Sequence, residues 1–334
     1  MSEEIKKFKV TIDGQTTEVE PGTTILNAAR QIGGKSVPPA MCYYSKLENS
    51  GGRCRTCLVE VSKGSEADPR PMPKLVASCR TTVMDGMEVK NLTSEKTQEA
   101  RKAVTEFLLL NHPLDCPICD QAGECHLQDL GYEHGLQQTR NDFEKNTYDA
   151  DDLGPNIKLN MNRCILCARC VLVANQLTNT REHGILFRGD HAEISTYLNK
   201  ALDNDFIGNV IDVCPVGALT DRTARFASRV WFTKPVDATC TCSKCSGKAV
   251  LWMKGDEIVR VTARKDQYGE VEEFICNECR FEKKDVKHWN IEGPRHISRH
   301  SVISLNHYQK PEDAEVGKLE YETAKEISKK DNLE

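Results

Sequence analysis

Two stretches of sequence, MNRCILCARCV at residues 161–171 and GNVIDVCPVGALT at residues 208–220, decide the fold of the middle of this chain. The first stretch holds a CxxCxxC pattern, and the second supplies a remote cysteine followed by proline. Bacterial iron–sulfur proteins hold [4Fe–4S] clusters with this spacing, in which a CP cysteine can also serve a partner cluster. Because the segment has one complete set, we predict a [4Fe–4S] cluster here, with zinc as the alternative. Its ligands would be Cys164, Cys167, Cys170 and Cys214.

A second cysteine group lies upstream, in the run NHPLDCPICDQAGECHLQDL at residues 111–130. An apolar helical pattern, capped by Ser94, precedes it and ends at His112-Pro113. Three thiolates leave one corner of a cubane open, and His112 is better placed to fill it than His126, which adjoins Cys125. A neutral imidazole removes one negative charge and should raise the reduction potential. The predicted [4Fe–4S] ligands are His112, Cys116, Cys119 and Cys125.

The N-terminal segment predicts a β-grasp domain with a [2Fe–2S] cluster. Alternating apolar residues reach a tight turn at Asp13-Gly14, which indicates a hairpin. Thr24 can cap a short helix that ends at Gly33, and a strand at 58–61 follows the cysteine loop. Gly51 and Gly52 would let the backbone approach the cluster sulfides closely. The ligands would be Cys42, Cys54, Cys57 and Cys79, with a four-cysteine zinc site as the alternative.

A fourth group supplies two CxxC pairs joined by the hairpin-like stretch VLWMKGDEIVRV, which turns at Gly255-Asp256. Two such pairs on a ribbon favour a structural, electrically silent zinc ion, whereas a further [4Fe–4S] cluster or a mononuclear iron is also open. The metal ligands would be Cys242, Cys245, Cys276 and Cys279. Cys240 is expected to be a free thiol, although an iron–sulfur cluster could use it as a ligand.

Composition limits the remaining possibilities. The chain has 334 residues, 39% hydrophobic and 6% aromatic, so metal sites should supply much of the stability of its small cores. A net charge of −5 argues against a general nucleic-acid binder. The start MSEEIKK lacks a leader pattern, and no apolar run is long enough to span a membrane. We therefore expect a cytoplasmic protein with reduced cysteines.

These segments give an α+β protein in five parts. We predict a β-grasp [2Fe–2S] ferredoxin domain at 1–92, a helical [4Fe–4S] segment with one histidine and three cysteine ligands at 93–150, and a bacterial-ferredoxin-like [4Fe–4S] domain at 151–232. A small β-rich CxxC…CxxC ribbon follows at 233–290. A charged tail, solvated or docked on a partner, completes the chain at 291–334.

The chain resembles the iron–sulfur G subunit of bacterial NADH:quinone oxidoreductase, whose mitochondrial counterpart is the 75-kDa subunit of complex I. The two runs quoted first, the run at 111–130, RCRTCLVEV at 53–61 and VASCRTTVMDGMEV at 76–89 carry the likeness. It implies one [2Fe–2S] and two [4Fe–4S] clusters on the residues given above. It also implies a respiratory electron relay from a flavin/NADH-binding subunit towards quinone-side subunits.

Some expectations concern where this chain departs from the family. Its members usually continue into a molybdopterin-oxidoreductase-like region, but this chain is a short form, so we expect no molybdenum cofactor. A proline- and charge-rich insertion at 64–74 lengthens the loop before Cys79. At the fourth group, Ala249 stands where some members have a third cluster ligand. We expect no NADH or quinone site, no nucleic acid and no membrane span in this chain.

Alternatives remain for the function. A diaphorase-side subunit of a soluble NAD-linked hydrogenase or formate dehydrogenase would share the first three motifs. A zinc-stapled scaffold without a redox role is the alternative from another class. The favoured location is cytoplasmic, in the peripheral arm of a complex attached to the inner face of the cell membrane.

Overall fold

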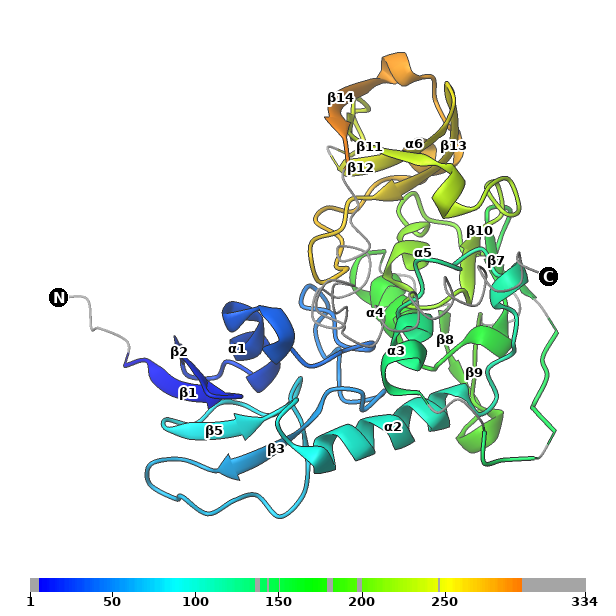
Figure 1. Cartoon of the computed structure of the whole chain (residues 1–334). Coiled ribbons are helices and arrows are strands. Elements are labelled where there is room, and N and C mark those ends of the chain that lie inside the picture. Colours follow the sequence, from blue (N-terminus) through cyan, green and yellow to red (C-terminus); the bar gives the residue numbers. More distant parts are fainter. Residues whose placement is uncertain are drawn as a thin grey trace, which may run out of the picture.

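The structure is a computed structural model that describes residues 6–135, 139–142, 144–149, 151–178, 183–196, 200–245 and 247–295. Figure 1 shows a β-rich N-terminal domain, a central region of short helices and strands, and a C-terminal sheet beyond it. This mixed arrangement confirms the predicted α+β class. The predicted tail lies mostly outside the described residues, from 296 to 334.

The N-terminal domain is built on a five-stranded sheet with the order β2-β1-β5-β3-β4. The predicted hairpin forms, because Asp13 and Gly14 take φ angles of 46° and 80° and so let β1 turn directly into β2. Strand β5 pairs parallel to β1 and antiparallel to β3. The strands are β1 (Phe8–Ile12), β2 (Gln15–Val19), β3 (Leu58–Lys63), β4 (Val76–Ala77) and β5 (Met87–Lys90).

Helix α1 (Ile25–Ile32) covers this sheet, as the sequence predicts. The Thr24 hydroxyl accepts a hydrogen bond from the Asn27 N–H at 3.3 Å, and Gly33 ends the helix with φ 78°. Its apolar face is buried against the strands. The 3-10 turn η1 (Gly34–Ser36) then leads into the loop that carries Cys42.

Helix α2 (Glu95–Leu109), capped by Ser94, runs from this domain to the central region (Figure 1). Its Arg101 is completely buried and donates to the Asn91 side chain at 2.6 Å and to the Thr56 carbonyl at 3.2 Å. Thr56 lies between Cys54 and Cys57, so its hydrogen bond with Arg101 holds the cysteine loop against α2. Helix α3 (His126–His134) packs against α2.

The central region consists of short elements that carry two cysteine sets. Helix α4 (Arg169–Gln176) packs on α5 (Asn209–Val213), and β10 (Leu219–Asp221) pairs with β7 (Ile157–Leu159). The other strands are β6 (Asp151–Asp152), β8 (His183–Leu186) and β9 (Glu193–Thr196). The 3-10 turns are η2 (Cys116–Ile118), η3 (Met161–Arg163), η4 (Gly189–His191) and η6 (Val230–Phe232).

The C-terminal sheet has the order β13-β12-β11-β14. The predicted hairpin joins β12 (Lys248–Lys254) to β13 (Glu257–Ala263), with Gly255 at φ 63°. Strand β11 (Lys234–Cys240) pairs with β14 (Trp289–Pro294), so the predicted boundary at residue 290 falls inside a strand. Helix α6 (Asn277–Phe281) and turn η7 (Val286–His288) lie between β13 and β14.

The loop after β13 also docks on the N-terminal domain, a contact that the sequence did not predict. Glu270 has 2% of its side chain exposed and pairs with Arg30 at 2.8 Å. The Arg30 guanidinium lies over the rings of Tyr43 and Tyr268, at 5.1 and 4.5 Å from their centroids. This ion pair fixes the C-terminal sheet to α1 and to the loop that carries Cys42.

None of the helices in the described part of the chain has both the length and the apolar character that crossing a bilayer requires.

Candidate metal centres

Site 1, defined as Cys42, Cys54, Cys57 and Cys79, lies in the loop between η1 and β3 and in the turn after β4. All four cysteines are buried. Their sulfurs form two close pairs. The Cys57 and Cys79 sulfurs are 3.3 Å apart, and a hydrogen bond from Cys42 lowers the pKa of Cys54 to about 5. A lowered thiol pKa favours the thiolate, which is the form that binds iron.

The backbone around site 1 suits an iron–sulfur cluster. Gly51 has φ 95°, and a Cβ there would lie 3.1 Å from the Cys79 sulfur. The Gly52 N–H donates to that sulfur at 3.2 Å, and the Arg53 N–H donates to the Cys42 sulfur at 3.3 Å. Such N–H groups stabilise thiolate charge and tune cluster potentials. Gly51 and Gly52 therefore let the backbone approach the Cys79 sulfur closely, and their predicted approach to cluster sulfides stays a prediction.

Site 2, defined as His112, Cys116, Cys119 and Cys125, surrounds turn η2 at the far end of α2. Cys119 and Cys125 are each 9% exposed, whereas Cys116 lies at the surface. The His112 Nδ1 atom is buried and has no hydrogen-bond partner among the described residues. Burial lowers the pKa of His112 to about 4, so its imidazole is neutral and can ligate a metal.

Three residues hold the site 2 loop in place. Arg163 pairs with Asp115 at 2.7 Å, and Arg229 donates to the Cys119 carbonyl at 2.6 Å. Gly217 packs so closely that a Cβ there would stand 2.2 Å from the Cys119 sulfur. Space for Cys119 therefore depends on a glycine in the run that follows Cys214.

Site 3, defined as Cys164, Cys167, Cys170 and Cys214, joins the loop after η3 to the end of α5. Leu166 and Ala168 have φ angles of 51° and 62°, in the left-handed region, so the backbone of the CxxCxxC run turns sharply at both residues. The Leu166 N–H donates to the Cys164 sulfur at 3.3 Å. Burial raises the pKa of Cys167 to about 11, so thiolates here require a cationic group between them.

Sites 1 and 3 share a buried arginine that sequence reasoning missed. Arg169 donates to the carbonyls of Ala40 and Tyr43 at 3.1 and 2.6 Å, beside Cys42. It also donates to the Val213 carbonyl at 3.4 Å, beside Cys214. Its position inside the CxxCxxC run was the available signal, because a charged residue between ligands must find buried partners.

Sites 2 and 3 are likewise adjacent. The His126 N–H donates to the Pro215 carbonyl at 3.2 Å, which joins the residues that follow Cys125 and Cys214. The Asp115–Arg163 pair joins the residues that precede Cys116 and Cys164. Residues next to the ligands of site 3 therefore contact residues next to the ligands of both site 1 and site 2.

The fourth site brings five cysteines together, between the end of β11, the following loop and α6. The Cys242 sulfur lies 3.4 Å from that of Cys245, 3.7 Å from Cys276 and 3.3 Å from Cys279. Tetrahedral zinc with bonds of about 2.3 Å requires thiolates about 3.8 Å apart. Four sulfur separations among the predicted ligands Cys242, Cys245, Cys276 and Cys279 lie between 3.3 and 3.8 Å, close to this spacing.

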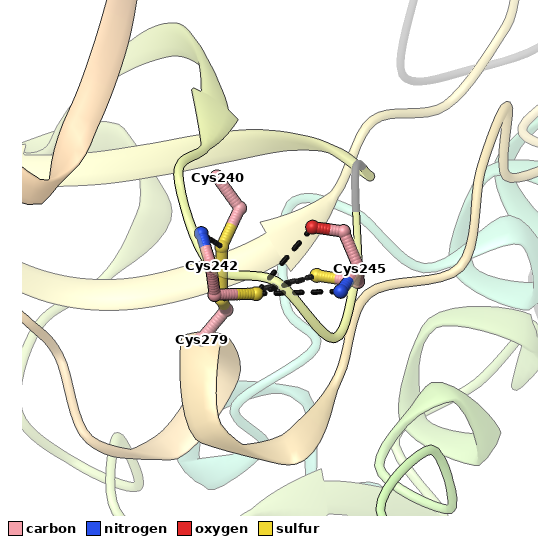
Figure 2. A group of neighbouring side chains, drawn as sticks. All are labelled: Cys240, Cys242, Cys245 and Cys279. Carbon is pink, nitrogen blue, oxygen red and sulfur yellow. Dashed lines mark hydrogen bonds between the residues drawn. A yellow bond between two sulfur atoms is a disulfide. The ribbon is translucent and has the colours of Figure 1, made fainter.

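Cys240 differs from expectation. The sequence predicts a free thiol outside the metal set, but in the structure Cys240 forms a disulfide with Cys279 (Figure 2). The reason is that β11 ends at Cys240 and directs this side chain towards α6. Cys240, Cys242, Cys245 and Cys279 form the one group of Cys, His, Asp or Glu in the described chain whose ligand atoms all lie within 4.8 Å.

Helix α6 connects the fourth site to site 3 through a buried ion pair. Arg280 and Asp212 pair with side chains only 1% and 2% exposed, and Arg280 also donates to the Asn209 side chain at 3.0 Å. Asp212 lies on α5, which ends just before Cys214. The ion pair therefore holds the helix of the fourth site against the helix that leads into Cys214 of site 3.

Three family models match the chain in sequence order. Residues 6–94 match a 2Fe-2S iron-sulfur cluster binding domain, and residues 101–140 match the NADH-ubiquinone oxidoreductase-G iron-sulfur binding region. Residues 154–220 match the ferredoxin-like domain of NADH-quinone oxidoreductase subunit 3. These matches confirm the predicted presence of 2Fe–2S and 4Fe–4S binding domains.

Curated relatives agree with the models. The G subunit of NADH-quinone oxidoreductase from Rickettsia bellii is 39% identical over 288 residues, which cover 86% of this chain and 40% of the relative. The NADH-ubiquinone oxidoreductase 75 kDa subunit of Reclinomonas americana is 39% identical over 285 residues, 85% of this chain and 39% of that protein. The chain thus spans about 40% of the length of these relatives.

A solved structure shares the fold. A chain of the NAD+-reducing [NiFe]-hydrogenase in the H2-reduced state superposes with a TM-score of 0.57 and 28% identity, covering 67% of this chain and 91% of that one. The relatives named above are similar over a larger share of this chain. Over about 86% of its length the chain is accordingly similar to the iron–sulfur G subunit, or 75-kDa subunit, of NADH-quinone oxidoreductases, and it contains the iron–sulfur domains that the three family models describe.

Proposed function

We propose that this chain is the electron-transfer subunit of a respiratory NADH:quinone oxidoreductase. Site 1 would hold a [2Fe–2S] cluster, and sites 2 and 3 would each hold a [4Fe–4S] cluster. When bound, each cluster supplies a one-electron carrier. The single observation that carries this proposal is the contact of site 3 with both other sites, through Arg169 and through the Asp115–Arg163 pair.

The contacts support an order of sites that differs from their order in the sequence. Because residues beside site 3 contact residues beside both other sites, we propose that electrons would pass from site 1 to site 3 and then to site 2. Site 2 is the exit because Cys116 lies at the surface, next to the exposed apolar side chains of Leu114 and Ile118, which are 91% and 59% exposed. A quinone-side subunit would cover this surface, and a flavin/NADH-binding subunit would donate at site 1.

The proposed ligands of site 2 favour its role as an electron acceptor. A neutral imidazole at His112 leaves site 2 with one negative charge fewer than four thiolates would give, which raises its potential. At site 1, the N–H groups of Gly52 and Arg53 stabilise thiolate charge. Gly217 and Arg229 fix the position of Cys119.

The fourth site is proposed to hold one structural zinc ion, because four of its sulfur separations, 3.3 to 3.8 Å, are close to those of a tetrahedral single-ion site. It lies beside site 3 but outside the sequence of sites from 1 to 2. Replacing Cys276 with Ala should therefore destabilise the C-terminal sheet without slowing electron transfer. A large loss of turnover in the correctly assembled complex would contradict the structural role.

The location that fits this function is the peripheral arm of a membrane-attached complex, on its cytoplasmic face. A second candidate, a diaphorase-side subunit of a NAD-linked hydrogenase, is favoured by the structural match to the hydrogenase chain. That match leaves a third of this chain uncovered, which is the observation that favours the first candidate. Identifying the subunits that copurify with the tagged chain distinguishes the two.

The test of the proposed order uses the Cys214→Ala variant in the purified complex. NADH is added, and the reduced clusters are followed by freeze-quench EPR. The variant should lose one [4Fe–4S] signal, keep NADH-dependent reduction of the [2Fe–2S] cluster, and fail to reduce site 2. Reduction of site 2 at the rate of the unmodified complex would contradict the order, and intact spectra would contradict the assignment of site 3.

A further inference from the structure

The fourth site contains one thiol more than a tetrahedral ion can bind. Five cysteine sulfurs lie there, whereas zinc in structural sites takes four ligands. Cys242, Cys245 and Cys276 are free in the structure, and Cys279 is bonded to Cys240. A sulfur in a disulfide is no longer a thiolate, so the ion and this bond compete for Cys279.

We propose that Cys240 and Cys279 form an oxidation-sensitive pair that controls metal binding at this site. In the reduced state, Cys279 completes a four-thiolate site with Cys242, Cys245 and Cys276. In the oxidised state, the Cys240–Cys279 bond removes that ligand and the ion is released. This inference rests on the structural zinc site proposed above.

The geometry allows the two states to exchange. The Cα atoms of Cys240 and Cys279 are 6.8 Å apart, within the range that a disulfide spans, so neither β11 nor α6 has to move. The Cys279 sulfur is also 3.3 Å from that of Cys242 and 3.8 Å from that of Cys245. A small rotation of the Cys279 side chain therefore moves its sulfur between two positions. In one it is bonded to Cys240, and in the other it is a metal ligand beside Cys242 and Cys245.

A cavity gives an oxidant a path to Cys240, whereas Cys279 is completely buried. This cavity of about 260 Å³ opens beside the pair and is lined by Cys240, Cys242, Lys244, Lys284 and His288, among others. The buried ion pair between Arg280 and Asp212 holds α6 against α5, so α6 keeps its position when the ion leaves the site.

The proposed oxidant class is a peroxide. The Cys240 thiol attacks one oxygen of hydrogen peroxide, the O–O bond breaks, and a sulfenic acid and water form. The Cys279 thiolate then attacks the Cys240 sulfur, the S–S bond forms, and hydroxide leaves and takes a proton from solvent. Two thiol sulfurs are oxidised by two electrons in total, and peroxide is reduced to two waters. A dithiol reductant reverses the bond by exchange.

The experiment uses the full chain, purified anaerobically with its zinc, and one equivalent of hydrogen peroxide. Released zinc is measured with a colorimetric chelator, and disulfides are mapped by differential alkylation and peptide mass spectrometry. The unmodified chain should release about one zinc per chain with the Cys240–Cys279 bond as the main product. The Cys240→Ser variant should contain the same zinc before treatment and release it about tenfold more slowly.

Failure of this inference is distinguishable from failure of the zinc site. If Cys240→Ser releases zinc as fast as the unmodified chain, or if oxidised chain keeps its zinc, the exchange is wrong while the site stands. If Cys240→Ser lacks zinc from the start, Cys240 is a ligand and the inference is overturned. The Cys242→Ser variant, which should lack zinc before any oxidation, tests the site itself.

Discussion

At the scale of single residues, the imidazole of His112 distinguishes site 2 from the sets that consist of thiolates alone. Its Nδ1 atom is buried without a partner among the described residues, and burial keeps the ring neutral. An orphaned polar atom in such a position normally has a ligand or a hydrogen bond to satisfy it. A bound cluster at site 2 would satisfy it.

Replacing His112 with Cys should keep a cubane at site 2 and lower its reduction potential by on the order of 100 mV, because a thiolate adds one negative charge. An EPR-monitored redox titration measures the shift. The neighbouring variant His126→Gln is the control and should titrate like the unmodified protein. If the titration curve of His112→Cys matches that of the unmodified protein, another residue ligates the cluster.

Gly217 offers a test of packing at the same scale. Its φ angle is ordinary for any residue, so Gly217→Ala adds no backbone strain, but its new Cβ would stand 2.2 Å from the Cys119 sulfur. We expect loss of the site 2 signal with the [2Fe–2S] signal preserved. Gly184→Ala, where nothing lies within 4 Å, is the matched control. Full occupancy of site 2 in Gly217→Ala would contradict the position of Cys119.

The sequence predicted some of the residues that shape these sites and missed others. The four ligand sets were predicted from their motifs, and Gly51 and Gly52 were predicted from the need for close backbone approach to sulfur. Arg169 and Gly217 were missed because their roles depend on segments far away in the chain. The pairing of Cys240 was mispredicted for the same reason: only the fold brings β11 next to α6.

At the scale of elements, short helices and strands position each metal site, and local signals predicted several of them. Asp13-Gly14 and Gly255 turn the two hairpins, and Thr24 and Gly33 delimit α1. The predicted boundary at residue 290 put part of strand β14 in the tail, because its residues Trp289–Pro294 show little hydrophobic alternation. Its partner β11 ends at Cys240, far back in the chain, so no local pattern indicates the pairing.

The contact between α5 and α6 gives a prediction at this scale. Arg280→Met leaves the Asp212 carboxylate buried without its cation, which should cost about 3–5 kcal/mol. We expect a lower melting temperature and weaker [4Fe–4S] binding at site 3, since α5 leads into Cys214. The double variant Asp212→Asn/Arg280→Met should recover part of the loss, because no charge remains buried.

Its control is Arg70→Met, which removes an ion pair with Asp68 at the surface. Differential scanning calorimetry of the anaerobic protein should show no change for that variant. If Arg280→Met melts like Arg70→Met, the link from α6 to α5 does not support site 3.

At the scale of the whole molecule, one continuous core joins the four cysteine sets. Cysteines of every set belong to this core, which runs from the Cys42 loop through α4 and α5 to α6. The Arg30–Glu270 pair closes the structure by tying the C-terminal sheet back to α1. The order of the motifs along the chain gave no sign that residues beside site 3 contact residues beside both site 1 and site 2. That arrangement follows from long-range contacts that no local pattern encodes.

The central claim is that this core carries three clusters in contact and one separate ion. The most direct measurement is the iron and zinc content of the anaerobically purified chain, combined with low-temperature EPR of the reduced sample. We predict about 10 iron and about 1 zinc per chain, with one [2Fe–2S] and two [4Fe–4S] signals. About 14 iron with a third cubane signal would contradict the zinc site. A colourless protein without iron would contradict the relay itself.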